Sequence, residues 1–197
     1  MKSCAEPILA FSTAMDIEFY MTEQPKDSRG FWLKLSKIGA PEVTITKEAA
    51  IESALCCGWI DGQLGKLDEH YYLVRMTPRR SGSRWSAKNR ACVEQLAREG
   101  RLKSAGLAEV EAAKSDGRWA AAYDSQAMAE VPHDLRAALA LNETANRFFE
   151  ALDRTNRFAI IYRVNDAKRA ETRAKRIAQF INMLTRGETP HPLKKGR

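Results

Sequence analysis

The sequence predicts an α+β protein, in which a small antiparallel sheet with helices comes first and an all-helical part follows. Residues 31–36, 59–64 and 71–77 are rich in aromatic and aliphatic residues, as is typical of strands. After Pro78, apolar residues recur at helical spacing instead. With 197 residues, 44% of them hydrophobic, the chain can build one large domain or two small ones.

The first part is expected to span residues 1–80. Its strand 31–36 is followed by a helix that Thr46 caps and Gly58 ends. The next two strands are separated by about six residues, a length that suits an antiparallel hairpin. These two strands are therefore expected to pair as a hairpin.

The helical part is expected to span residues 81–188 and to pack on the first part. Ser83 or Ser86 can cap its first helix, Ser104 the second, and Pro132 fits the start of a third. Phe148 and Phe149 belong to the next helix. The last helix has the clearest pattern, a seam of apolar residues at alternating spacings of three and four. The seam comprises Ala167, Ala170, Ala174, Ile177, Ile181 and Leu184. Residues 189–197 are expected to form a flexible basic tail.

Charge is distributed unevenly along the chain, whose net charge is +7. Residues 75–103 carry nine Lys and Arg against two Glu, and residues 154–197 carry twelve against three acids. The basic segments either pair with the acidic remainder or form a positive surface for an acidic partner.

The sequence indicates a cytoplasmic location. No run of apolar residues is long enough for a membrane helix, so no membrane insertion is expected, and residues 8–15 make a poor signal peptide. The four cysteines lack metal-ligand spacing, and the adjacent pair Cys56-Cys57 would form a strained disulfide, which favours reduced thiols.

Several familiar chemistries have no motif in the chain. It lacks a P-loop, a dinucleotide-binding glycine pattern and a nucleophile elbow, and its three histidines are scattered. We therefore expect no metal and no cofactor. Catalysis is not expected either, although carboxylates and arginines remain able to support it.

The most informative segment is residues 77–89, which holds Arg79, Arg80 and Arg84 with several hydroxyls and no acid. Such a segment makes a poor core but suits an anion, because arginine offers a planar fork of donors. The three arginines would grip a small anionic ligand at the joint between the two parts. Ser86 and Asn89 would orient this ligand.

A second cluster surrounds Asp61, which lies between two glycines in a predicted strand. One interpretation is an ion pair with Arg75 or Arg79. The other places Asp61 in the pocket, as a hydrogen-bond acceptor or as a weak candidate for a catalytic general base, with Trp59 or Trp85 as a wall. The tryptophans are equally interpretable as core residues.

The basic residues 168–176 of the last helix have two interpretations as well. They form either a solvated face opposite the seam or a cationic face for phosphate. The helix expected over residues 105–115 could imitate the base-reading helix of a helix-turn-helix, but Glu109 and Glu111 disfavour that role.

Taken together, these motifs resemble the YdeI/OmpD-associated family of bacterial proteins. The resemblance rests on Ala54–Gln63, Thr77–Arg80, Ser83–Asn89, Ala105–Leu107, Ala113–Trp119 and Glu171–Ile177. It implies an association with protection against bacteriocins and cationic antimicrobial peptides, and a YjbR- or frataxin-like α+β fold. It also implies that Arg173, in the final motif, joins the arginine cluster in the ligand site.

The resulting hypothesis is a bacterial cytoplasmic stress or peptide-resistance protein that binds a small anionic ligand in a cleft lined by arginine and tryptophan. The alternative is a nucleic-acid-associated protein that uses both basic segments, and the third is an enzyme with Asp61 as general base. Direct contact with the porin in the family's name is not expected for a chain without an export signal. The sequence indicates neither the ligand nor the oligomeric state.

Overall fold

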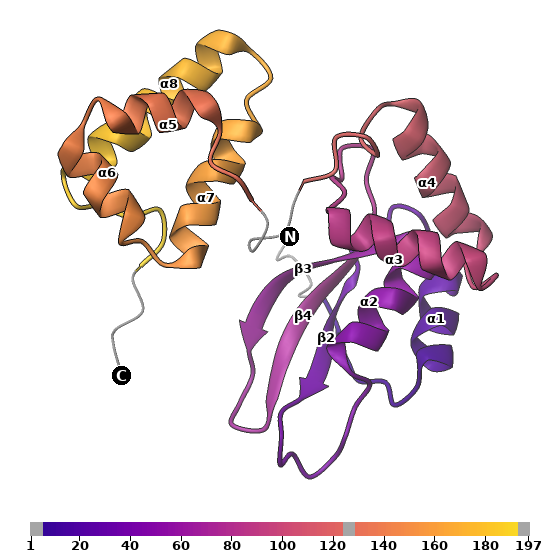
Figure 1. Ribbon diagram of the computed structural model, residues 1–197. Coiled ribbons are helices and arrows are strands. Elements are labelled where there is room, and N and C mark those ends of the chain that lie inside the picture. Colours follow the sequence, from indigo (N-terminus) through magenta and orange to yellow (C-terminus); the bar gives the residue numbers. More distant parts are fainter. Residues whose placement is uncertain (1–5, 124–128, 193–197) are drawn as a thin grey trace, which may run out of the picture. The chain divides into compact units, whose positions relative to one another are not determined.

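The fold was analysed in a computed structural model that describes residues 6–123 and 129–192 (Figure 1). The chain divides into two compact units, residues 1–122 and 123–197. The first unit combines a four-stranded sheet with helices, and the described part of the second is helical. The α+β class predicted from the sequence is confirmed.

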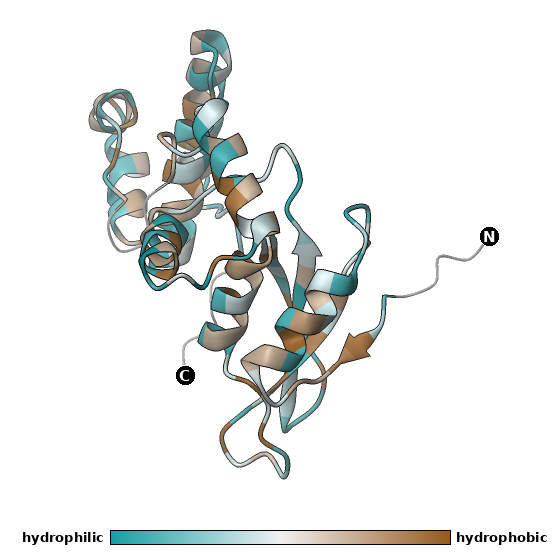
Figure 2. Ribbon diagram, turned by 90° about the vertical axis from the view of Figure 1, so that its right-hand side faces the viewer, coloured by the Kyte–Doolittle hydropathy of each residue, from teal (hydrophilic) through white to brown (hydrophobic). Residues whose placement is uncertain are grey.

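The sheet of the first unit has the strand order β1-β2-β4-β3. Its strands are β1 (Ile8–Leu9), β2 (Phe31–Ser36), β3 (Trp59–Lys66) and β4 (Tyr71–Pro78). The pairs β2–β4 and β3–β4 are antiparallel as expected, but the short hydrophobic strand β1 runs parallel to β2 and makes the sheet mixed (Figure 2). A strand of two residues is too short to leave an alternating pattern in the sequence.

One face of the sheet builds the core, to which the two central strands contribute alternate residues. Phe31 and Leu33 of β2 lie opposite Met76 and Val74 of β4, and all four are buried. Cross-strand neighbours on one face of an antiparallel pair are in contact distance, so these four residues form a continuous apolar surface. The antiparallel pair β3–β4 confirms the predicted hairpin.

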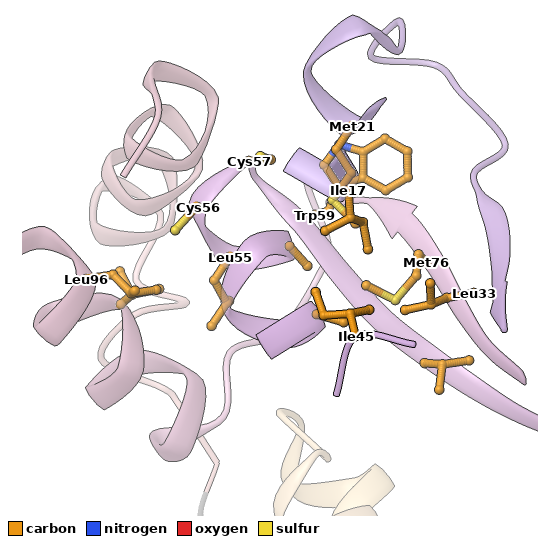
Figure 3. Close-up of a cluster of buried hydrophobic side chains, with 14 of the residues drawn as sticks. Ile17, Met21, Leu33, Ile45, Leu55, Cys56, Cys57, Trp59, Met76 and Leu96 are labelled. Carbon is orange, nitrogen blue, oxygen red and sulfur yellow. The ribbon is translucent and has the colours of Figure 1, made fainter. Parts of the chain in front are cut away.

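The described part of the first unit also contains the helices α1 (Ala14–Glu23), α2 (Lys47–Cys56), α3 (Ala87–Arg98) and α4 (Ser104–Ser115). The predicted boundaries of α2 are confirmed. The Thr46 hydroxyl accepts a hydrogen bond from the Ala49 N–H at 3.2 Å, and Gly58 leaves the helix with φ of +74°. Figure 3 shows Leu55 and Cys56 of α2 in the cluster of buried side chains that also holds Leu33, Met76 and Leu96.

The boundary between the units lies at residues 122 and 123, whereas the sequence predicted a boundary near residue 80. Helices α3 and α4 account for the difference. Val93 and Leu96 of α3, and Val110 and Ala113 of α4, are buried in the same core as the sheet. Both helices pack against α2, which itself packs against β3, so they extend the core that begins at the sheet.

Helix α4 approaches the end of α2 closely. The Lys103 N–H donates to the Cys56 carbonyl at 3.0 Å. At Gly106, a Cβ atom would lie only 2.4 Å from the same carbonyl oxygen. Because neither neighbour can move without shifting a helix, this position requires glycine.

The second unit contains α5 (His133–Ala140), α6 (Glu143–Glu150), α7 (Arg154–Asn165) and α8 (Ala170–Thr185). Its own core is formed by Leu135, Leu139, Ala145, Phe149, Leu152, Ile160, Ile161, Val164, Ile177, Phe180 and Leu184. Helix α7 was not predicted, although Asp153 caps it by accepting from the Asn156 N–H at 2.8 Å. As predicted, Ile177 and Leu184 share a cluster with Phe149 and Leu152.

The N-terminal half of the predicted seam is wrong. Ala170 and Ala174 are exposed, whereas Arg173 and Arg176 are half-buried on the inward side of α8. The interpretation of residues 168–176 as a solvated face is therefore wrong for these two arginines. Of the predicted tail, residues 193–197 lie outside the described residues, and the His191 N–H donates to the buried Asn156 side chain at 2.8 Å.

Candidate functional site

The loop between β4 and α3, residues 79–86, carries most of the predicted site residues, and we call it the arginine loop. The Arg79 N–H donates to the Gly58 carbonyl at 3.0 Å, which fixes the start of the loop against the end of α2. A turn follows, in which the Arg80 N–H donates to Ser83 Oγ at 2.9 Å and the Ser83 N–H to the Arg80 carbonyl at 2.8 Å. The loop is thus a defined structure and not a random connection.

Arg79 is the inner cation of this loop, since only 6% of the residue is exposed. Its guanidinium lies over the Trp85 ring, with Cζ 3.6 Å from the ring centroid, and Nη1 donates to the Arg84 carbonyl at 3.3 Å. Trp85 is buried and meets the Trp119 ring edge-on at 5.0 Å. Stacking on an indole favours a buried guanidinium and holds its plane in one orientation.

The indole of Trp85 also contributes a hydrogen-bond donor to the interior of the loop. Within the described part of the chain, its Nε1 has no acceptor. A buried donor without a partner costs free energy, which an incoming acceptor would recover.

The outer surface of the loop is strongly basic. Residues 77–90 contain five Lys and Arg and no acid. Arg80 is exposed, and Arg84 is partly exposed. The concentration of cations at one loop raises the local potential and attracts anions.

Arg118 also joins the arginine loop, and the site residues predicted from the sequence did not include it. Its Nη1 donates to the Ser83 carbonyl at 2.9 Å, and its Nε donates to Asp116 at 2.7 Å. The contact spans 35 positions, so no local pattern predicts it. The only feature of the sequence that could have indicated a role for Arg118 is its position next to Trp119 in the motif Ala113–Trp119.

Ser86 and Asn89 lie at the start of α3, where Ser86 Oγ accepts from the Asn89 N–H at 3.1 Å. This confirms Ser86 as one of the two predicted helix caps, and its oxygen is engaged in that role. The first turn of α3 carries Lys88 and no acid. The positive end of the helix dipole therefore adds to the positive potential of the loop.

Trp59 and Asp61 both lie on β3, the edge strand next to β4. Trp59 is 3% exposed and packs on Phe31 at 5.7 Å, so it serves the core. Asp61 is half-buried opposite Met76, beside an irregularity in the strand pairing. Among the described residues, no ion pair or hydrogen bond joins Asp61 to an arginine.

Arg75, one arginine proposed to pair with Asp61, has other partners. Its Nη2 lies 3.1 Å from Glu6 Oε1 and donates to the Arg29 carbonyl.

Arg173 lies in the other unit, on α8. Its Nε and Nη2 donate to the two carboxylate oxygens of Asp134 at 2.5 and 2.9 Å, and Nη1 donates to the Val164 carbonyl at 2.9 Å. These bonds from Arg173 hold the pKa of Asp134 below its usual value. Arg173 thereby ties α8 to α5 and to the last turn of α7.

The cysteines and the potential metal ligands of the described residues do not form a second candidate site. Burial raises the pKa of Cys56 to about 11 and also raises the pKa values of Cys57 and Cys92, which disfavours the nucleophilic thiolate. Cys4 lies outside the described residues. Within 6–123 and 129–192, no cluster of three potential metal ligands is present. None of the helices in these ranges combines the length and the apolar character that crossing a bilayer requires.

These features define a class: a two-unit α+β protein with a basic loop on its first unit. The chain belongs to the family described as Domain of unknown function (DUF8412), whose model matches residues 9–109, just over half of the chain. Residues 128–187 match the family model described as Bacteriocin-protection, YdeI or OmpD-Associated. The predicted resemblance is thus confirmed, with its match in the second unit, while most motifs that suggested it lie in the first. No curated protein and no solved structure matches the chain.

Proposed function

We propose that this protein acts in bacteriocin protection in the bacterial cytoplasm and binds a small anionic ligand at the arginine loop. The association with bacteriocin protection comes from the family match of residues 128–187. The anion site is a separate step. It rests on one observation, namely that residues 77–90 carry five cations and no acid on a loop with a defined backbone.

The chemistry of this loop favours a compact anion such as a phosphate or carboxylate group. Arg80 offers an exposed guanidinium, whose planar donors match two oxygens of such a group. The first turn of α3 directly follows the arginine loop in the chain and provides backbone N–H groups at the positive end of the helix dipole. Asp61 and Trp59 have no part in this site, and Arg173 serves the second unit.

Calorimetric titration with inorganic pyrophosphate tests the site. We expect binding to the full-length protein and a loss of roughly tenfold in affinity for Arg80→Ala, since one charge-assisted hydrogen bond contributes about 1.5 kcal/mol or more. Arg98→Ala is the matched control, because Arg98 is also exposed and lies at the C-terminal end of α3, away from the arginine loop in the chain. Equal affinities for the two variants would contradict the proposal.

The nucleic-acid alternative predicts a different dependence on salt and length. Duplexes of two lengths, titrated at two salt concentrations, separate the two functions. A single-anion site binds both duplexes alike, whereas binding that follows the phosphate backbone strengthens with length and weakens steeply with salt.

The protective role is tested in cells that lack the gene. Complementation with Arg98→Ala should restore bacteriocin tolerance, and complementation with Arg80→Ala should fail.

A further inference from the structure

Helix α1 has two apolar faces, and the core uses only one of them. Ile17 and Met21, one turn apart, are buried against the sheet. Met15 and Phe19 are also one turn apart, but they are 76% and 69% exposed. A single exposed apolar residue is ordinary, whereas two large neighbours on one helix face form a patch that calls for a partner. Helix α1 lies on the right-hand side of the first unit in Figure 1, the side that is turned toward the viewer in Figure 2.

This apolar pair is set among acids. Between Lys2 and Lys26 the chain contains four acids and no Lys or Arg. Two of the acids have basic partners, because Glu6 pairs with Arg29 and Arg75, and Glu18 pairs with Lys103 at 3.4 Å.

The other two acids, Asp16 and Glu23, are exposed and form no ion pair with any described residue. Asp16 follows Met15 directly, and Glu23 lies one turn beyond Phe19, so both flank the apolar pair on the outer side of the helix. The surface formed by Met15, Asp16, Phe19 and Glu23 is named the outer face of α1.

We propose that the outer face of α1 docks a cationic amphipathic peptide, whose apolar side covers Met15 and Phe19 and whose Lys or Arg side chains meet Asp16 and Glu23. Charge complementarity selects this occupant. A second copy of the chain would bring the same acids against each other across a two-fold axis, which is unfavourable. This surface is independent of the arginine loop, since the loop repels cations and the outer face attracts them.

The test uses the full-length protein and a labelled 14-residue helical peptide of Leu and Lys. A peptide with the same Leu positions and Glu in place of Lys is the charge control. We expect the Leu/Lys peptide to bind, as measured by fluorescence anisotropy, and the Leu/Glu peptide to bind at least about tenfold more weakly.

Variants separate the apolar from the electrostatic contribution. Phe19→Ser should weaken binding by about tenfold or more, because a large buried side chain is lost from the contact. Ile38→Ser, which removes a fully exposed apolar side chain elsewhere in the unit, should leave binding unchanged. Glu23→Gln should weaken binding at low salt and match the wild type at high salt.

Circular dichroism should show that each variant keeps the wild-type helix content. The proposal is overturned if Phe19→Ser binds like the wild type, or if both peptides bind alike. Self-association of the wild type that Phe19→Ser abolishes would also overturn it, in favour of a second copy as the occupant. An unchanged affinity of the same variants for pyrophosphate distinguishes this surface from the anion site.

Discussion

Arginine has three different structural roles in this protein, which depend on what each side chain contacts. Arg79 lies on an indole, Arg80 projects into solvent, and Arg173 grips a carboxylate in the second unit. A guanidinium on an aromatic ring or a carboxylate is already engaged, so the exposed one is best placed to recruit a ligand. The basic composition of a segment is therefore a poor measure of its available charge.

Arg173→Ala should destabilise the second unit by about 1–2 kcal/mol. The variant loses the bidentate ion pair with Asp134 and the hydrogen bond to the Val164 carbonyl at the end of α7. Because the Asp134 side chain is 43% exposed, solvent screens the ion pair and limits the loss of stability. Urea denaturation followed by circular dichroism measures the loss. Lys175→Ala, at an exposed position of the same helix, should change stability by less than about 0.5 kcal/mol. Equal stabilities of the two variants would exclude a structural role for Arg173.

The same pair makes part of the stability dependent on pH. Arg173 lowers the pKa of Asp134 in the folded state, so this contribution is complete above the unfolded value near 3.8 and is lost as the pH falls through the folded value. The stability difference between wild type and Arg173→Ala should therefore shrink from pH 6 to pH 3. A difference that stays constant over this range would contradict the assignment.

Contacts between neighbouring residues were predictable from the sequence, whereas contacts between distant residues were not. The caps Thr46 and Ser86 were predictable because a cap and its helix are adjacent in the chain. The Arg118–Ser83 bond and the Arg173–Asp134 pair join positions more than thirty residues apart, and side-chain chemistry alone does not select such partners. Because the sequence does not identify Asp134 as the partner of Arg173, the resemblance of motifs places Arg173 in the ligand site, whereas the structure shows it in an ion pair.

Among the helices, α4 depends on a close backbone contact at Gly106. Gly106→Ala should lower the stability of the first unit by about 2 kcal/mol, because its Cβ would overlap the Cys56 carbonyl. Helix propensity alone would favour alanine by about 1 kcal/mol, so a loss identifies packing as the cause. Gly82→Ala, where the added Cβ meets nothing within 4 Å, serves as the control in thermal melts. A harmless Gly106→Ala would mean that α4 is free to shift.

Helix α8 offers a sharp test of which face is buried. Ile177→Asp should cost about 3–4 kcal/mol, since it places an unpaired charge in the core of the second unit. Ala174→Asp belongs to the same predicted seam but is exposed, and it should cost less than about 0.5 kcal/mol. Chemical denaturation of both variants decides between the predicted seam and the observed face. Comparable losses would favour the seam.

Strand β2, which has one buried face, was predictable from the sequence, and helix α1, which has two apolar faces, was not. The strand β2 alternates cleanly between buried and half-buried residues, and its bounds are as predicted. In α1, Ile17 points inward and Phe19 outward, which removes the helical period on which a prediction depends. A second apolar face can thus conceal a helix from a prediction based on periodicity.

At the scale of the whole molecule, the two units have separate cores with no common residue. We expect two unfolding transitions in the full-length chain. All four tryptophans lie in the first unit, so tryptophan fluorescence should follow that transition alone, while far-ultraviolet circular dichroism follows both. Gly106→Ala should move only the first transition and Ile177→Asp only the second. A single transition with both probes coincident would contradict this independence.

The stacking of Arg79 on Trp85 has an optical consequence. The emission energy of an indole shifts when a charge beside its ring is neutralised, and here a fixed cation lies 3.6 Å from the ring centroid. An anion bound at the arginine loop would partly compensate this field. Trp85 therefore serves as an intrinsic fluorescent reporter of anion binding at the arginine loop. We expect pyrophosphate to shift the tryptophan emission of the wild type. A Trp85→Phe variant that still binds pyrophosphate but lacks this shift would assign the signal to Trp85.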